Sequence, residues 1–334
     1  MSSEHSSGSK LFFKNFTSLV VKDQSLPGSG NSEIIFISIN NTGTRLVNSR
    51  TDKSIRIWKC TPDRLTEPII IENAHIKSVE SISWHPRTEY TFASVGRDEY
   101  VRIWKGINGT MEKEIKVSKE SNTPAVCQIV KFSIDGEILC VVDRDSTVSM
   151  FSVLNDYAKV QETKIKEHIY DALWFNKDHD FLMFALHDGS VPLYKADEKM
   201  RYQLKKTFTG HRSSATCLAI DPRGKYFAIG SNEGVVSIWN TATMLNSKVL
   251  SDVDAAISHV DISRDGAYIA VSYDSHSNAR IYDVTTADQV FEVPNSLSGN
   301  SVLSFITWFP NKTAFIYSSD YGRTMTLMKK LDKS

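Results

Sequence analysis

Several features that mark whole classes of protein are scarce in this sequence. Its 334 residues carry 39 Lys and Arg against 39 Asp and Glu, so no global positive field draws the chain to nucleic acid or to an anionic membrane. No apolar run approaches the length of a membrane span, and the first ten residues lack the apolar core of a signal peptide. We therefore expect an intracellular protein with no membrane partner, whose contact with RNA is at most indirect or local.

Residues that commonly form chemical sites are equally sparse. The four cysteines (Cys60, Cys127, Cys140 and Cys217) are scattered, without a CxxC pair or a histidine at zinc-ligand spacing. No GxSxG, HExxH, P-loop or dinucleotide fingerprint is present, and the acidic and histidine run at residues 178–180 is typical of a solvated turn. We expect no catalytic residue, no bound cofactor or metal, and no small-molecule substrate.

What the sequence does have is an internal repeat. Its clearest copies are ASVGRDEYVRIWK (93–105), AIGSNEGVVSIWN (228–240) and NSRTDKSIRIWK (48–59). The final large side chain of each copy recurs every 43 to 47 residues, at Trp58, Trp104, Phe151, Tyr194, Trp239, Tyr282 and Met328. Spacing this regular over seven copies indicates one structural unit repeated seven times.

A second series of residues has the same period. An acidic residue stands six positions before the aromatic in five copies and eight positions before it in the last two, at Asp52, Asp98, Asp145, Asp188, Glu233, Asp274 and Asp320. Between these turns lie β-branched and aromatic residues with period-two alternation, which is typical of strands. Four short strands in each unit of about 40–45 residues predict an all-β protein, a single seven-bladed β-propeller of the WD-repeat type.

The last repeat reaches the end of the sequence without residues for a fourth strand. The apolar segment at residues 11–23 precedes the first repeat and has no other assignment. We expect part of it, residues 18–23, to pair as the outer strand of blade seven and to cover an otherwise unpaired edge. The predicted domain is therefore a propeller over residues 11–334, preceded by a disordered tail at residues 1–10.

In WD repeats the indole N–H of the third-strand tryptophan is hydrogen-bonded in a network with a Ser or Thr, a His and the turn carboxylate. The candidate members are His75, Asp98 and Trp104 in blade two, and His211, Glu233 and Trp239 in blade five. His168 is a less complete candidate in blade four. Phe151 and Met328 offer no donor, so blades three and seven are expected to depend more on packing.

The residue just before each turn carboxylate is a candidate for contact with a partner, because this loop opens on one face of a WD-repeat propeller. Arg and Tyr dominate the energetics of many protein interfaces. The candidate contact residues are Arg97, Arg144 and Tyr273, with His187 as a fourth. The alternative is that they are solvated residues on ordinary surface loops.

Two segments resemble one family more closely than the general WD repeat. Residues 209–241, with the run DPRGKYFAIGS, and residues 75–105, with VESISWHP and VRIW, are similar to the WD-repeat subunit of the THO transcription–export complex. The resemblance implies a nuclear, non-enzymatic subunit that docks against the large helical THO subunits and works with other mRNA-export factors. Blades three and four depart from the family, with Pro192 inside a predicted strand.

Two other functions remain open at this point. One is a substrate receptor of a ubiquitin ligase, whose propellers often carry a WDxR phrase. Here Trp58, Trp104 and Trp239 are followed by Lys, Lys and Asn, which counts against that function. The other is a chromatin-associated propeller that binds histone or other peptides in its central channel, which requires an acidic or aromatic cage.

Overall fold

The computed structural model describes residues 9–21, 23, 25–66, 68–175, 179–197, 200–274, 277–294, 305–319 and 322–330. The chain divides into two compact units, one of Ile34–Gly210 and one of Met1–Glu33 with His211–Ser334. Each unit consists of four-stranded antiparallel sheets, and the two are described separately below.

The unit Ile34–Gly210 contains four sheets, which we number as blades one to four in chain order. Blade one consists of β2 (Ile34–Ile39), β3 (Arg45–Arg50), β4 (Ile55–Lys59) and β5 (Ile69–Ile71). Blade two consists of β6 (Ser81–Trp84), β7 (Thr91–Val95), β8 (Tyr100–Lys105) and β9 (Met111–Lys116). Blade three consists of β10 (Cys127–Phe132), β11 (Ile138–Asp143), β12 (Thr147–Ser152) and β13 (Ala158–Lys164). Blade four consists of β14 (Ile169–Phe175), β15 (Phe181–Leu186), β16 (Val191–Ala196) and β17 (Tyr202–Phe208).

The second unit contains blades five to seven. Blade five consists of β18 (Ala215–Ile220), β19 (Tyr226–Ser231), β20 (Val236–Asn240) and β21 (Asn246–Leu250). Blade six consists of β22 (Ile257–Ile262), β23 (Tyr268–Tyr273), β24 (Arg280–Asp283) and β25 (Gln289–Glu292). Blade seven consists of β26 (Ile306–Trp308), β27 (Ala314–Ser319), β28 (Thr324–Lys330) and β1 (Phe16–Val21).

Seven such sheets confirm the predicted fold class, an all-β seven-bladed propeller. Each of the seven aligned large residues lies in the third strand of its blade, where all but Tyr194 are buried. The first three strands of each blade bury most of their side chains. The turn residue Asp320 lies outside the described residues.

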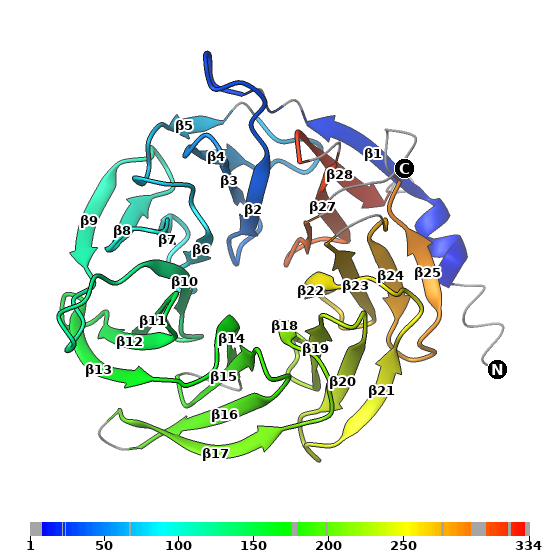
Figure 1. Cartoon of the computed structure of the whole chain (residues 1–334). Helices are drawn as coiled ribbons and strands as arrows, with labels where there is room; N and C mark the ends of the chain where they lie inside the picture. The colour runs from blue at the N-terminus through cyan, green and yellow to red at the C-terminus, as the bar shows by residue number, and fades with distance from the viewer. Residues whose placement is uncertain are drawn as a thin grey trace. The chain divides into compact units, whose positions relative to one another are not determined.

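The N-terminal strand completes blade seven, as predicted. Strand β1 pairs antiparallel with β28, from Phe16 opposite Lys330 to Val21 opposite Met325. Figure 1 shows the two strands side by side although they come from opposite ends of the sequence. The observed strand begins and ends two residues earlier than the predicted range 18–23.

The segment before β1 differs from the prediction, because residues 9–14 form a short helix. Residues 9 and 10 were expected to belong to a disordered tail, yet Ser9 is buried and its Oγ donates a 2.9 Å hydrogen bond to Oδ2 of Asp283. The helix buries Phe13 among the aromatic rings of blades six and seven. Residues 1–8 of the expected tail lie outside the described residues.

Pro192 lies in β16 and affects its hydrogen-bond ladder as its chemistry requires. Strand β16 pairs with β15 only from Leu193 onward, through three residue pairs that end at Lys195 opposite Phe181. Toward the outer strand β17 the pairing continues through Pro192, which lies opposite Thr207. The proline therefore marks the point where the inner ladder of this blade stops, because it has no N–H to donate.

Two further features are the state of the four cysteines and the length of the helices. Cys127, Cys140 and Cys217 are buried, Cys60 is half-buried, and all four are free thiols. Burial raises the pKa of the Cys140 thiol to about 12, so this thiol stays protonated at neutral pH. Within the described part of the chain, no helix has both the length and the apolar character needed to cross a membrane.

Candidate interaction surface and its supporting network

Blade two contains a continuous hydrogen-bonded network that holds the turn before β8. Trp104 Nε1 donates to Ser94 Oγ at 2.8 Å, and Ser94 Oγ lies 2.8 Å from Nε2 of His75. Nδ1 of His75 lies 3.0 Å from Oδ2 of Asp98. Because the indole can only donate and the carboxylate can only accept, the chain of donors runs from Trp104 through Ser94 and His75 to Asp98.

The same contacts set the charge states in this network. Burial is the largest influence on His75 and lowers the pKa of its imidazole below the ordinary value of 6.5, and its contact with Asp98 offsets this only in part. Burial also opposes the charged form of Asp98, but hydrogen bonds from His75 and from the backbone N–H groups of Ile76 and Tyr100 hold its pKa below the usual value. The pair is therefore a neutral imidazole that donates to a carboxylate.

Blade five repeats this arrangement with one change. His211 Nδ1 lies 3.3 Å from Oε1 of Glu233, and His211 Nε2 lies 2.7 Å from Ser237 Oγ, which accepts from Trp239 Nε1 at 2.8 Å. The serine comes from the third strand, because Ile229 stands ten residues before Trp239, where blade two has Ser94, and its side chain forms no hydrogen bond. The structure thus brings together all six residues predicted for the two networks.

Blade one has a shorter version that the sequence reasoning missed. Trp58 Nε1 donates to Asn48 Oδ1 at 2.7 Å. Asn48 stands ten residues before Trp58, as Ser94 stands ten before Trp104, so this spacing was a usable signal. In blade four, the ring of His168 packs edge-on against Tyr170 with centroids 4.8 Å apart.

Blade three, which was expected to depend on packing, is held by an ion-pair cluster. Lys119, from the loop before β10, places its Nζ 2.6 Å from Oδ2 of Asp143 and 2.8 Å from Oδ2 of Asp145. The Lys119 side chain is only 3% exposed. Burial disfavours the charged amine, but the hydrogen bonds to Asp143 and Asp145 outweigh it and raise the Lys119 pKa. A lysine thus joins loop to turn, as His75 does in blade two.

Three of the four predicted contact residues are displayed on turns, and the networks described above hold two of these turns, those of blades two and three. Arg97 is exposed, with a left-handed backbone (φ 51°), and its Nε lies 2.9 Å from Oε1 of Glu80. Arg144 is exposed in the equivalent turn of blade three and makes no ion pair with any residue that the structure describes. Arg144 therefore offers a guanidinium to solvent.

His187 is exposed in the equivalent turn of blade four. Its Nδ1 lies 3.0 Å from the hydroxyl of Tyr170, which is 41% exposed. Tyr170 also packs against His168, so three aromatic side chains group at one end of this blade. Large aromatic side chains exposed at a surface are typical of protein–protein interfaces.

The structure corrects the fourth candidate, Tyr273. This residue is only 3% exposed, and its hydroxyl lies 3.2 Å from that of Tyr282. Arg97, Arg144 and His187 follow the ends of their strands, whereas Tyr273 is the last residue of β23 itself. In blade six the additional turn residues follow Asp274. This acidic residue therefore stands directly after β23, and the position before it belongs to the sheet.

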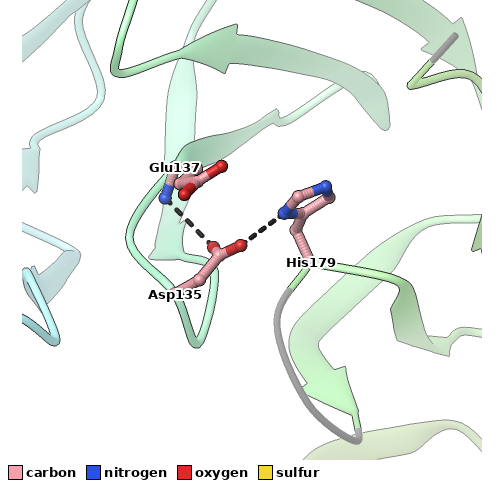
Figure 2. Close-up of side chains that lie close together, drawn as sticks. All are labelled: Asp135, Glu137 and His179. Carbon is pink, nitrogen blue, oxygen red and sulfur yellow. Dashed lines mark hydrogen bonds and ion pairs between the residues drawn. The ribbon is translucent and has the colours of Figure 1, made fainter. Parts of the chain in front are cut away.

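One cluster has the composition of a metal site. Ligand atoms of Asp135, Glu137 and His179 lie within 4.8 Å of one another, and Figure 2 shows His179 pointing at Asp135 from the neighbouring blade. The Asp135 carboxylate already accepts from Ser133 Oγ, from the Glu137 N–H and from His179 Nδ1. Its acceptors are thus occupied by protein donors, and we assign the cluster to joining blades three and four.

Comparison with known proteins finds the same repeat in two parts of the chain. A model described as WD domain, G-beta repeat matches residues 66–105 and 202–240. The chain is a WD-repeat β-propeller. The two matched segments include the first three strands of blades two and five, the blades with the complete network from tryptophan to carboxylate.

The relatives of this WD-repeat protein confirm the resemblance seen in its sequence. It is 26% identical to the protein named THO complex subunit 3 of Arabidopsis thaliana over 288 residues, which cover 85% of each chain. It is 21% identical to Protein TEX1 of Saccharomyces cerevisiae over 91% of this chain and 72% of that protein. It is 26% identical to WD repeat-containing protein AAC3 of Dictyostelium discoideum, but spans only 46% of its length.

Proposed function

We propose that this chain is a non-enzymatic scaffold subunit of a THO complex, acting in the nucleus where transcription is coupled to mRNP assembly and mRNA export. The observation that supports this most is the similarity to THO complex subunit 3 over 85% of both chains. Its partners would be the large helical THO subunits and other mRNA-export factors. Contact with RNA would be indirect or local, since the chain has equal numbers of positive and negative residues.

The contact surface that we assign to these partners is formed by the turns before the third strands of blades two to four. Arg97, Arg144 and His187 are exposed there, and the buried networks below hold the first two turns in place. A rigid turn lowers the entropy cost of ordering a contact residue on binding. Such a surface suits stable binding of a partner protein better than catalysis.

The direct test is affinity purification of the tagged endogenous protein, followed by mass spectrometry. Recovery of large helical THO subunits in stoichiometric amounts is the expected result. Recovery of a cullin adaptor without THO subunits would instead favour the ubiquitin-ligase receptor, and a chromatin modifier would favour the peptide-binding propeller. Either outcome would overturn the proposal.

The contact surface has its own test. The double variant Arg97→Glu and Arg144→Glu should lower recovery of the partner subunits about tenfold, because like charges facing a complementary surface are unfavourable. Arg87→Glu is the matched control, since Arg87 is exposed at the opposite end of β7. Unchanged recovery from the double variant, with an unchanged melting temperature, would mean that partners bind elsewhere.

A further inference from the structure

A cavity of about 310 Å³ opens in the unit that contains blades five to seven. It lies between the N-terminal helix and the first turns of blades six and seven, at residues 263–268 and 308–313. The aromatic rings of Phe12, Tyr268 and Trp308 line it. Small-ligand sites usually measure about 300–1,000 Å³, so this cavity suits one side chain with its adjoining backbone.

Charged residues at the cavity favour an anionic ligand. Arg264 and Lys312 line it, with Asp265 as the acidic lining residue. The Asp265 carboxylate is held in the turn, where its Oδ1 accepts from Ser263 Oγ at 2.7 Å and from the backbone N–H of Ala267 at 3.1 Å. The chain as a whole is neutral, so a net positive lining is a local property of this cavity.

Trp308 contributes its ring, and not its N–H, to the cavity wall. Trp84 and Trp174, at the corresponding positions of blades two and four, donate their indole N–H groups to the backbone oxygens of Ser38 and Lys131 at 3.2 and 3.3 Å. Trp308 is 7% exposed, and its Nε1 finds no acceptor among the described residues. That nitrogen has almost no solvent-exposed surface, so a ligand in the cavity contacts the indole ring and cannot accept from its N–H.

We propose that this cavity binds an acidic segment of a partner protein, with an apolar side chain seated against the aromatic rings. The carboxylates of that segment pair with Arg264 and Lys312. The inference goes beyond the proposed function, because it holds whether or not the partner is a THO subunit.

Single-stranded RNA is also anionic, but the rings disfavour it. Phe12 stacks on Tyr268 with an interplanar angle of 15°, and Tyr268 stacks on Trp308 with an angle of 19°. Binding of single strands requires open ring faces on which successive bases stack. Here the neighbouring rings stack on one another instead. The cavity beside them suits a compact apolar group.

Binding is measured with the full chain and three labelled probes, by fluorescence anisotropy. The first is a short Glu- and Asp-rich peptide with a central Phe, the second is the same peptide with a central Gly, and the third is oligouridylate. We expect the first peptide to bind about tenfold more tightly than the second. Equal binding of both peptides, no binding of either, or preferential binding of oligouridylate would overturn the proposal.

Variants then locate the binding. Arg264→Glu with Lys312→Glu should weaken binding of the Phe peptide about tenfold, whereas Lys14→Glu, exposed on the same helix but outside the cavity lining, should leave it unchanged. Asp265→Asn keeps an acceptor for Ser263 and Ala267 and should strengthen binding about two- to threefold. If neither the double variant nor Asp265→Asn changes binding of the Phe peptide, the peptide binds elsewhere and the cavity is rejected as its site.

Discussion

Nζ of Lys119 lies 2.6 Å from Oδ2 of Asp143, and both side chains are 3% exposed. An ion pair this deeply buried is a poor source of net stability but is costly to break, because removal of one partner leaves the other charge unpaired. It therefore holds one arrangement of the loop before β10 against the end of β11.

Lys119→Met should therefore destabilise the fold by about 3 kcal/mol, because it leaves Asp143 buried without its cation. Chemical denaturation followed by tryptophan fluorescence measures the change. Lys116→Met is the matched control: this lysine also pairs with a carboxylate, that of Glu99, but is solvent-exposed, so its unfolding midpoint should not move. Equal effects of the two substitutions would contradict the assigned role of Lys119.

The histidine network of blade two should make stability depend on pH. Unfolded His75 binds a proton near pH 6.5, whereas the folded residue has a lowered pKa. The unfolded state therefore binds more protons between these values, and stability is lost as pH falls below about 6.5, by at most about 1.4 kcal/mol per pH unit.

The measurement is a series of denaturation curves from pH 7.5 to 5.5, in which His75→Gln should show a shallower decline than the parent chain. His187→Gln, at an exposed histidine, controls for the loss of an imidazole as such. A decline of the same steepness in all three proteins would show that His75 is not responsible.

The N-terminal helix should contribute directly to stability. Phe13 is 2% exposed and packs against Phe16, Tyr268 and Phe291 with ring centroids 4.9 to 5.4 Å apart. Phe13→Ala should cost about 3 kcal/mol through lost burial and the cavity that it leaves. Leu11→Ala, at a residue that is 57% exposed on the same helix, should cost far less. Equal stability of the two variants would mean that the helix does not hold this position in solution.

The Asp135 cluster should behave as a link between blades and not as a metal site. Asp135→Asn keeps the acceptor used by Ser133 but loses the charge facing His179, and should cost about 1.5–3 kcal/mol. Excess EDTA should leave the melting temperature of the parent chain unchanged. A fall on adding EDTA, reversed by a divalent cation, would show that Asp135, Glu137 and His179 bind metal.

The repeat made the seven blades and their third strands predictable, because the large residue at each position must fill the same space. The less regular parts were not predictable in this way. Residues 9–14 contain two adjacent phenylalanines, which fit a strand or a helix equally well, and only packing against Tyr268 and Trp308 decides between them. Lys119 was missed because a lysine carries no signature of the position that histidine occupies in other blades.

The candidate contact residues also differ in how well the sequence predicted them, according to whether their turn keeps the regular spacing. Arg97 and Arg144 were placed correctly in turns because their acidic neighbours keep the regular spacing to the third strand. Tyr273 was misplaced because the two additional turn residues follow Asp274, so the position before this acidic residue is the last residue of β23. A rule based on spacing is reliable only where the turn length is constant.

The pairing of β1 with β28 also constrains when the fold can be completed. Phe16 pairs with Lys330, so the ribosome makes the two partners about 300 residues apart. At about 5–20 residues per second, β1 exists for tens of seconds before β28 is made. During synthesis the apolar residues of β1 therefore depend on chaperones or on transient contacts, and blade seven is the last sheet that the nascent chain can finish.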